Sequence, residues 1–318
     1  MKKAFTLIEL LIVIGIIAIL AGTLLGNYSN ITNRVRAAKC QTNLRNLAQA
    51  VGSYLVSSGR YPFAGTAEYI RTTGGTDNQG LEIREFKGWV SADTRGVNYP
   101  IQGNNPANPT PISYANGDFD TVNYAITNGA IWEAVGMNKD CYLCPVHVEA
   151  CRRQGVRQPG WSYQMNAWFG FGGGELLTPG SYIEAASVTR ADRILLFAEI
   201  PALAPTSKDA LKAKAKLPEP NLTGGNGDPA MCGCLVSKKT ASDHPGANAG
   251  GGNASIGFNH VRGRDIVGHV AFADGHVEAL VAPKNGNFDD LTDWLCQGKD
   301  IVIQGKNYVE VKDSEMDN

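Results

Sequence analysis

The chain opens with the stretch KKAFTLIELLIVIGIIAILAG, residues 2–22, in which one carboxylate, Glu9, interrupts an apolar run. A carboxylate placed in hydrocarbon costs about 2.5–3.5 kcal/mol on insertion scales, so it usually has a partner or a function. The only cations close by in the sequence, Lys2 and Lys3, precede the run and are placed as positive-inside anchors. The stretch therefore predicts a long apolar helix with a functional charge near its start.

The apolar run from Phe5 to Leu25 suits a membrane helix. At about 1.5 Å per residue it would cross a hydrocarbon core of about 30 Å. A plain anchor would have the same length. A secretory signal peptide has a shorter apolar region that ends in a small-residue cleavage site, and this run fits that pattern poorly. Neither alternative explains Glu9.

The segment KKAFTLIELLIVIGIIAIL resembles the class III signal of type IV prepilins and type II secretion pseudopilins. Both have a short basic leader, a small residue, and a phenylalanine followed by Thr-Leu-Ile-Glu. In that family a prepilin peptidase cuts before the phenylalanine and methylates the new amine. The resemblance implies a leader peptide at residues 1–4 and cleavage between Ala4 and Phe5, with Ala4 at the position where the family usually has glycine.

Cleavage would create an α-ammonium that can pair with Glu9. Phe5 and Glu9 are four residues apart and share one face of a helix. The resemblance implies that the glutamate meets the amine of a neighbouring subunit in a filament. A buried charge that is paired only by assembly sets register more than stability, so we assign Phe5 and Glu9 to assembly.

Apolar residues continue at three- and four-residue steps from Ile31 to Leu55, beyond the apolar run. The pattern predicts one helix from about Phe5 to Ser58, ended by Gly59. The alternative is two helices separated near Gly22 and Gly26, because glycine weakens a helix by up to about 1 kcal/mol.

The predicted organisation is a leader at 1–4, a transmembrane half of the helix at 5–27, an amphipathic half at 28–59 and a globular head at 60–318. The chain has 37 glycines and 15 prolines, which indicate a head with long loops and many short strands. We expect an α+β fold in which the long helix packs on an antiparallel sheet. Charged residues make up 19% of the chain and the formal net charge is −1, so no nucleic-acid partner is predicted.

Near the carboxyl end, GHVAFADGHVEALV predicts a β-hairpin with Asp274-Gly275 at its tip. Small or polar residues alternate with Val270 and Phe272 before the turn and with Val277 after it. An Asp-Gly pair between alternating strands favours a type I′ turn, in which both central residues have positive φ.

The LCP, ILLFAE and FADGHVEAL segments, together with the amino terminus, resemble prepilin-like proteins that have an H-x9-DG processing-associated domain. The spacing differs here: Arg264 occupies the expected histidine position, while thirteen residues separate His260 from Asp274. A four-residue insertion would make His260 the equivalent. The alternative is that His269, Asp274 and His276 are hairpin residues on a polar face.

The segment CYLCPVHVEAC groups three cysteines and a histidine, and three further cysteines follow later in the chain. The candidates for disulfides are Cys141, Cys144, Cys151, Cys232, Cys234 and Cys296. Thiols outside the cytoplasm tend to oxidise, so disulfides that join the segment to a later cysteine are expected. Alternatives are a zinc site that includes His147, or free thiols. Cys40 lies in the long helix and is expected to be the unpaired cysteine of the seven.

No cofactor is predicted, although Asn116, Asp118 and Asp120 form an alternating oxygen-ligand run that would suit Ca²⁺. The resemblance supports this weak candidate, since related pseudopilins can bind calcium. The alternative is a turn rich in Asn and Asp. The sequence contains no nucleophile elbow, Walker loop or His-Glu-x-x-His motif, so we do not expect an enzyme.

The sequence therefore predicts a pilin or pseudopilin, the structural subunit of a type IV pilus or a type II secretion pseudopilus. The resemblance implies three kinds of partner: other subunits, the prepilin peptidase and an inner-membrane assembly platform. It also implies a single-pass inner-membrane protein before assembly, with the head outside the cytoplasm. The alternative is a membrane-tethered binding or enzymatic head that uses the helix only as an anchor.

Overall fold

The structure is a computed structural model of the 318-residue chain. It describes residues 7–64, 88–90, 126–155, 159–170, 184–204, 206–218, 220, 234–235, 255–304 and 307–310.

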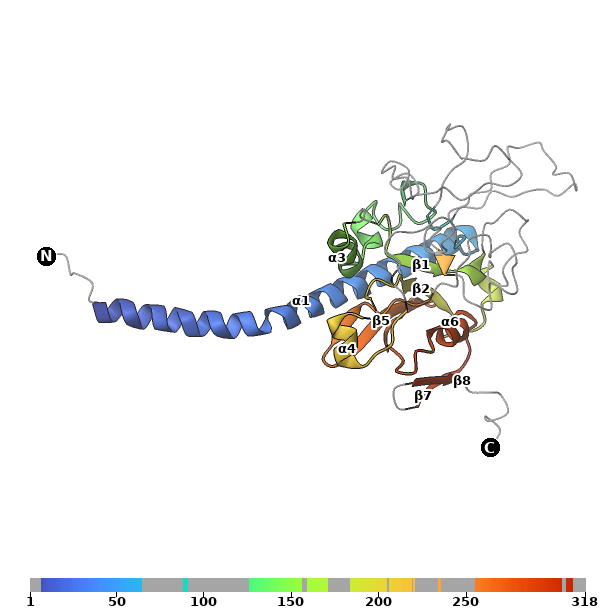
Figure 1. Cartoon of the computed structure of the whole chain (residues 1–318). Coiled ribbons are helices and arrows are strands. Elements are labelled where there is room, and N and C mark those ends of the chain that lie inside the picture. Colours follow the sequence, from blue (N-terminus) through green and yellow to red (C-terminus); the bar gives the residue numbers. More distant parts are fainter. Residues whose placement is uncertain are drawn as a thin grey trace, which may run out of the picture.

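A long amino-terminal helix, α1 (Leu7–Ser58), dominates the molecule (Figure 1). It ends at Gly59, whose φ of 71° lies in the left-handed region and whose N–H donates to the Leu55 carbonyl at 2.8 Å. Glycine reaches this conformation without the penalty that a Cβ imposes. The prediction of one uninterrupted helix ended by Gly59 is confirmed, and the alternative of two helices is wrong.

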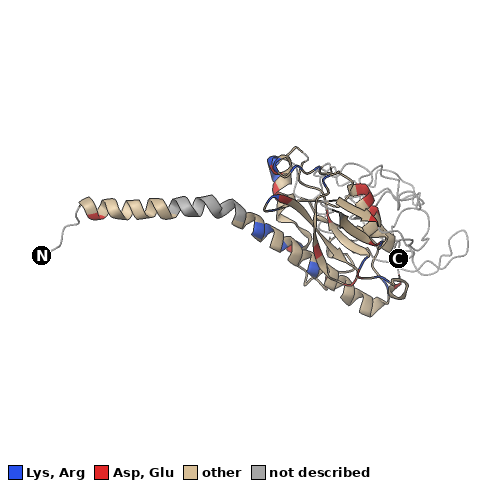
Figure 2. Cartoon of the chain, turned by 90° about the horizontal axis from the view of Figure 1, so that it is seen from below, with Lys and Arg blue, Asp and Glu red and all other residues tan. Residues whose placement is uncertain are grey.

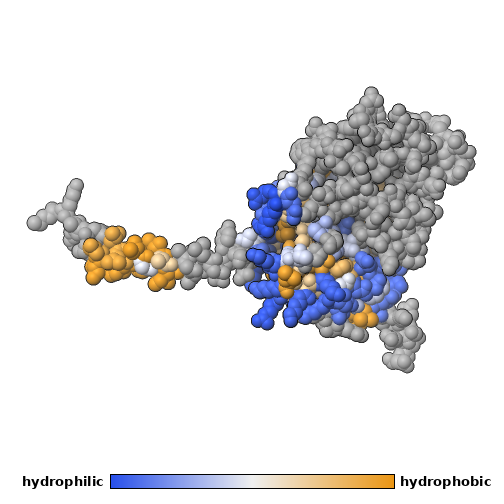
Figure 3. Space-filling model, in the orientation of Figure 1, coloured by the Kyte–Doolittle hydropathy of each residue, from blue (hydrophilic) through white to orange (hydrophobic). Residues whose placement is uncertain are grey.

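The first part of α1 projects from the head and exposes apolar side chains (Figure 3). Leu7 is 77% exposed and Ile19 is 70% exposed. Within the part of the chain that the structure describes, no helix is both long and apolar enough to cross a membrane. The transmembrane half expected at 5–27 is thus not confirmed.

The second part of α1 packs along the head (Figure 2). Leu44, Leu47 and Val51 follow at steps of three and four residues and are fully buried. These spacings place the three side chains on one face of the helix. This buried face fits the amphipathic half that was expected at 28–59, whose bounds stay a prediction.

A mixed sheet lies against this face of α1. Its strands are β1 (Tyr163–Asn166), β2 (Leu195–Glu199), β3 (Cys234–Leu235), β4 (His260–Arg262), β5 (Asp265–Phe272) and β6 (Val277–Val281). Their order is β3-β1-β2-β5-β4, and β6 also pairs with β5. The pairs are antiparallel except for the parallel pair β1 and β3. The α+β class and the antiparallel sheet are as predicted, with this one parallel pair as an addition.

Strands β2 and β4 lie end to end along one edge of β5. Ala198 in β2 pairs with Val270, and His260 in β4 pairs with Val267. Val267 also pairs with Val281 of β6, so β6 occupies the opposite edge. The last residue of β2 therefore lies near the first residue of β4.

The hairpin predicted at Asp274-Gly275 joins β5 and β6, and its existence is confirmed. Its turn differs from the expected type I′, because Gly275 has a positive φ of 93° whereas Asp274 does not. The Gly275 N–H donates to the Phe272 carbonyl at 2.9 Å, and the Phe272 N–H donates to the His276 carbonyl at 2.9 Å. These contacts describe a three-residue loop in which glycine takes the position that needs positive φ.

Short elements complete the head. They are η2 (Lys139–Tyr142), α3 (Pro145–Arg153), η3 (Ala167–Phe169), η4 (Ala185–Ser187), α4 (Lys208–Ala213), α6 (Phe288–Cys296), β7 (Ile301–Gln304) and β8 (Asn307–Glu310). Strands β7 and β8 form a separate two-stranded sheet.

The described residues of the head form two apolar clusters. The first joins the buried face of α1 to β1 and β2, and includes Leu47, Tyr163 and Phe197. The second joins α6 to β5, and includes Leu291 and Val270. The first cluster holds α1 against the head and surrounds the buried polar group described next.

Candidate functional site

The buried face of α1 carries two polar side chains, Cys40 and Asn43, which are both fully buried. The Asn43 amide donates to the carbonyls of Asp140 at 3.0 Å and Leu143 at 2.8 Å. It also donates to the Tyr163 hydroxyl at 3.3 Å. Because these acceptors belong to η2, to the residue after it and to β1, Asn43 holds the segment before α3 against α1.

This segment brings Cys144 to Cys40. Cys144 is the amino-terminal cap of α3, and Pro145 follows at the first helical position, where its fixed φ suits a helix start. The Cys144 side chain is fully buried. The two sulfur atoms, Cys40 Sγ and Cys144 Sγ, are 2.7 Å apart.

A buried carboxylate, Glu199, lies at the end of β2 beside this pair. One of its oxygens, Oε1, lies 2.8 Å from His269 Nδ1 and 3.0 Å from His260 Nε2. The other oxygen, Oε2, accepts from the Asn259 amide at 2.9 Å. Both carboxylate oxygens therefore have partners, as burial of a charge requires.

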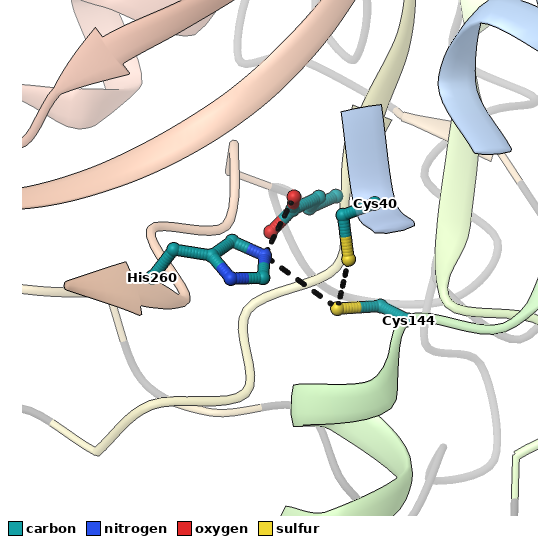
Figure 4. Close-up of side chains that lie close together, drawn as sticks. Cys40, Cys144 and His260 are labelled. Carbon is teal, nitrogen blue, oxygen red and sulfur yellow. Dashed lines mark hydrogen bonds and ion pairs between the residues drawn. The ribbon is translucent and has the colours of Figure 1, made fainter. Parts of the chain in front are cut away.

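His260 links the carboxylate to the thiols. Its Nε2 lies 3.7 Å from Cys144 Sγ as well as 3.0 Å from Glu199 Oε1. Figure 4 shows Cys40, Cys144 and His260 converging from α1, from the start of α3 and from β4. We call Cys40, Cys144, Glu199 and His260 the buried cluster; their ligand atoms all lie within 4.8 Å of one another.

The two thiols of the buried cluster differ in acidity. Burial, followed by the hydrogen bond to Cys144 and the charge of Glu199, raises the pKa of Cys40. Burial also opposes ionisation of Cys144, but the hydrogen bond from Cys40 and the contact with His260 lower the pKa of Cys144 overall. The pair therefore favours one thiol that donates to one thiolate.

The carboxylate and imidazole stabilise each other's charged forms. Burial alone would raise the pKa of Glu199, but the charge and hydrogen bond of His260 and the hydrogen bond of His269 lower it. Burial alone would lower the pKa of His260, but the charge of Glu199 raises it. The buried cluster thus combines sulfur, nitrogen and oxygen donors, which allows it to coordinate a metal ion or to oxidise at its two thiols.

Several predicted site residues lie outside the described residues. They are Ala4, Phe5, Asn116, Asp118, Asp120 and Cys232. The described part of the chain does include Glu9, which lies in the first turn of α1 and is exposed. The processing and calcium assignments therefore stay predictions.

The structure describes the side chains of four of the six cysteines that were candidates for disulfides. Cys141, Cys144, Cys151 and Cys296 are buried and form no disulfide with one another, so a bridge from the segment to Cys296 is not formed, and bridges to Cys232 or Cys234 stay predictions. The physical reason is separation: Cys144 faces α1, whereas Cys296 belongs to the second apolar cluster. The side chain of Cys234 lies outside the described part of the structure.

Cys40 was expected to be the unpaired cysteine, and it forms no disulfide in the described part of the chain. Its sulfur nevertheless lies against Cys144, a contact that was not expected. The helical spacing could have indicated that the Cys40 side chain faces the head, because Cys40 precedes Leu44 and Leu47 on the same buried face of the helix. Glu199 was also missed, although a carboxylate directly after the apolar residues of ILLFA indicates a buried charge that needs partners.

The three histidines of the carboxyl-terminal region lie in two different environments: two are buried and one lies at the hairpin. His260 and His269 are 2% and 1% exposed and share Glu199, so the alternative that placed His269 on a polar face is wrong. His276 stays at the hairpin, where its Nδ1 lies 2.6 Å from Asp274 Oδ1. Only His260 of these three contacts a described cysteine.

Comparison with known proteins identifies the class of the amino terminus. Residues 1–25 match the prokaryotic N-terminal methylation motif. The chain therefore has a prepilin-type amino terminus.

The chain is similar to curated type IV major pilins and fimbrial proteins. The chain is 34% identical over 108 residues to a type IV major pilin of Neisseria gonorrhoeae, and the match covers 32% of this chain and 59% of that relative. It is 32% identical over 106 residues to a fimbrial protein of Neisseria meningitidis serogroup B, covering 32% of this chain and 62% of that relative. The chain thus spans about three fifths of these relatives' length, and it is homologous to type IV pilins. No solved structure matches it significantly.

Proposed function

We propose that this chain is a structural subunit, a pilin or pseudopilin, of a type IV pilus or a type II secretion pseudopilus. One observation carries the proposal: the methylation motif at residues 1–25 includes the exposed apolar part of α1, from Leu7 to Leu20. The similarity to a type IV major pilin and to a fimbrial protein supports it.

The exposed part of α1 explains how such a subunit would assemble. Ile8, Leu10, Ile16 and Ile19 are each more than half exposed. A continuous apolar surface of this kind marks a contact with a membrane or with another protein. We infer that lipid covers this surface before assembly and that neighbouring helices cover it in the filament, so helix burial offsets extraction from the bilayer.

The further partners follow from this mechanism. The prepilin peptidase would cut between Ala4 and Phe5 on the cytoplasmic side. An assembly platform in the inner membrane would then move the subunit from the bilayer into the filament. Before assembly the chain would cross the inner membrane once and hold its head outside the cytoplasm. Among the described residues, the head packs on the second part of α1, and the first part exposes its apolar side chains for these contacts.

Replacing Glu9 tests the proposal. In Glu9→Val a costly charge is removed from the apolar segment, so we expect the variant to enter the membrane at least as well as the wild type. Filament yield should fall sharply, because the charge that sets the axial position of neighbouring subunits is lost. The two quantities to measure are filament yield by electron microscopy and the abundance of the chain in the membrane fraction.

Leu10→Val is the matched control, since it changes an adjacent apolar residue and preserves Glu9. It should form filaments at the wild-type level. Normal filaments from Glu9→Val would contradict the registry role of Glu9. A chain that never forms or joins filaments would favour the membrane-tethered head instead.

A further inference from the structure

We propose that the buried cluster of Cys40, Cys144, Glu199 and His260 binds one zinc ion. The donor set contains two sulfurs, one imidazole nitrogen and one carboxylate oxygen, all from residues that are fully or almost fully buried. Zinc takes ligands of these three kinds, usually four of them in a tetrahedral structural site. Four protein ligands would leave no open position, so the site is structural.

The donors lie at or below the spacing of a small tetrahedral site, so a bound ion would push two of the pairs apart. Zinc bonds of about 2.3 Å to sulfur and about 2.0–2.1 Å to nitrogen or oxygen give donor separations of about 3.4–3.8 Å. The observed separation of Cys144 Sγ and His260 Nε2 is 3.7 Å, and that of His260 Nε2 and Glu199 Oε1 is 3.0 Å. The two sulfurs, at 2.7 Å, must move apart by about 1 Å to reach the tetrahedral value.

Residues around the buried cluster already orient its ligands. Asn259 donates to Glu199 Oε2, and His269 lies 2.8 Å from Glu199 Oε1. Asn43 fixes the carbonyl of Leu143, the residue before Cys144. Hydrogen-bonded neighbours of this kind are typical of metal sites, because they hold the ligand side chains in position.

A disulfide between Cys40 and Cys144 is the rival. It would use two of the four donors and would require the sulfurs to approach to about 2.05 Å. A zinc ion would use all four donors, and it would also account for the imidazole and carboxylate that meet beside the thiols. Metal binding releases the thiol proton of Cys40 and any proton on His260 to solvent, and it involves no oxidation.

The zinc ion would join α1 to the head. Its ligands come from α1, from the residue that begins α3, from β2 and from β4. A single ion would therefore tie the filament-forming helix to three separate segments of the head. This role is independent of whether the first part of α1 forms filaments.

The experiment measures metal in the full-length chain, purified in detergent without chelators or reductants. We expect about one zinc ion per chain by elemental analysis. Cobalt(II) added to the chelator-treated chain should give a thiolate-to-cobalt charge-transfer band, which requires sulfur ligands. Cys144→Ser should lose the zinc and the band.

Cys151→Ser is the matched control, because Cys151 is a buried thiol of α3 outside the buried cluster. It should keep both the zinc and the band. The cobalt measurement on the unaltered chain tests the site even where Cys144→Ser fails to fold. A metal-free chain that takes up neither zinc nor cobalt, or a peptide map with Cys40 joined to Cys144, would overturn the proposal.

Discussion

Gly275 shows how a single residue decides a local structure. Its φ of 93° is one that residues with a Cβ rarely adopt, and among the described residues beyond its two chain neighbours no heavy atom lies within 4 Å of the place where a Cβ would stand. The requirement for glycine is therefore conformational, not a matter of space.

We expect Gly275→Val to lower the free energy of unfolding of the head by about 1–2 kcal/mol, because a β-branched residue resists positive φ. Urea denaturation followed by tryptophan fluorescence measures the change. Gly275→Asn is the control and should cost less, since asparagine tolerates the left-handed region. Equal stability of the valine variant and the wild type would show that the turn does not need glycine.

At the scale of the element, the second part of α1 is held by the buried apolar side chains on one of its faces. Leu47 is fully buried in the first apolar cluster, whereas Gln49, two residues further along, is exposed. This contrast separates the contribution of packing from that of helix propensity.

Leu47→Ala should lower the free energy of unfolding by about 2–5 kcal/mol, the range for a buried leucine whose removal leaves a cavity. Alanine favours helix, so the loss would report packing against the head and not the helix itself. Gln49→Ala is the control and should change stability little. Similar urea midpoints for the two variants would mean that α1 does not depend on this contact.

At the scale of the whole molecule, the mature chain should begin at Phe5. The methylation motif at residues 1–25 predicts removal of residues 1–4 and methylation of the new amine. Intact-mass analysis of the native protein should show both changes. A mature chain that starts at Met1, or near Gly26 as after secretory cleavage, would contradict this prediction.

The sequence by itself determined the features that depend on near neighbours in the chain. The helical spacing that includes Leu44, Leu47 and Val51 predicted α1, and Gly59 predicted its end. The hairpin at Asp274-Gly275 followed from two alternating strands joined by a turn pair. These signals are local because a helix face repeats every three to four residues and a hairpin turn closes within a few residues.

The residues of the buried cluster are brought together by the tertiary structure alone. Cys40 and Cys144 are 104 positions apart, and Glu199 and His260 are 61 apart. No local pattern indicates that these residues meet, so neither the contact of Cys40 with Cys144 nor the role of Glu199 could be predicted from the sequence. They meet because α1 packs across the sheet and because β2 and β4 lie end to end along β5, which places a thiol pair, a carboxylate and an imidazole at one buried point.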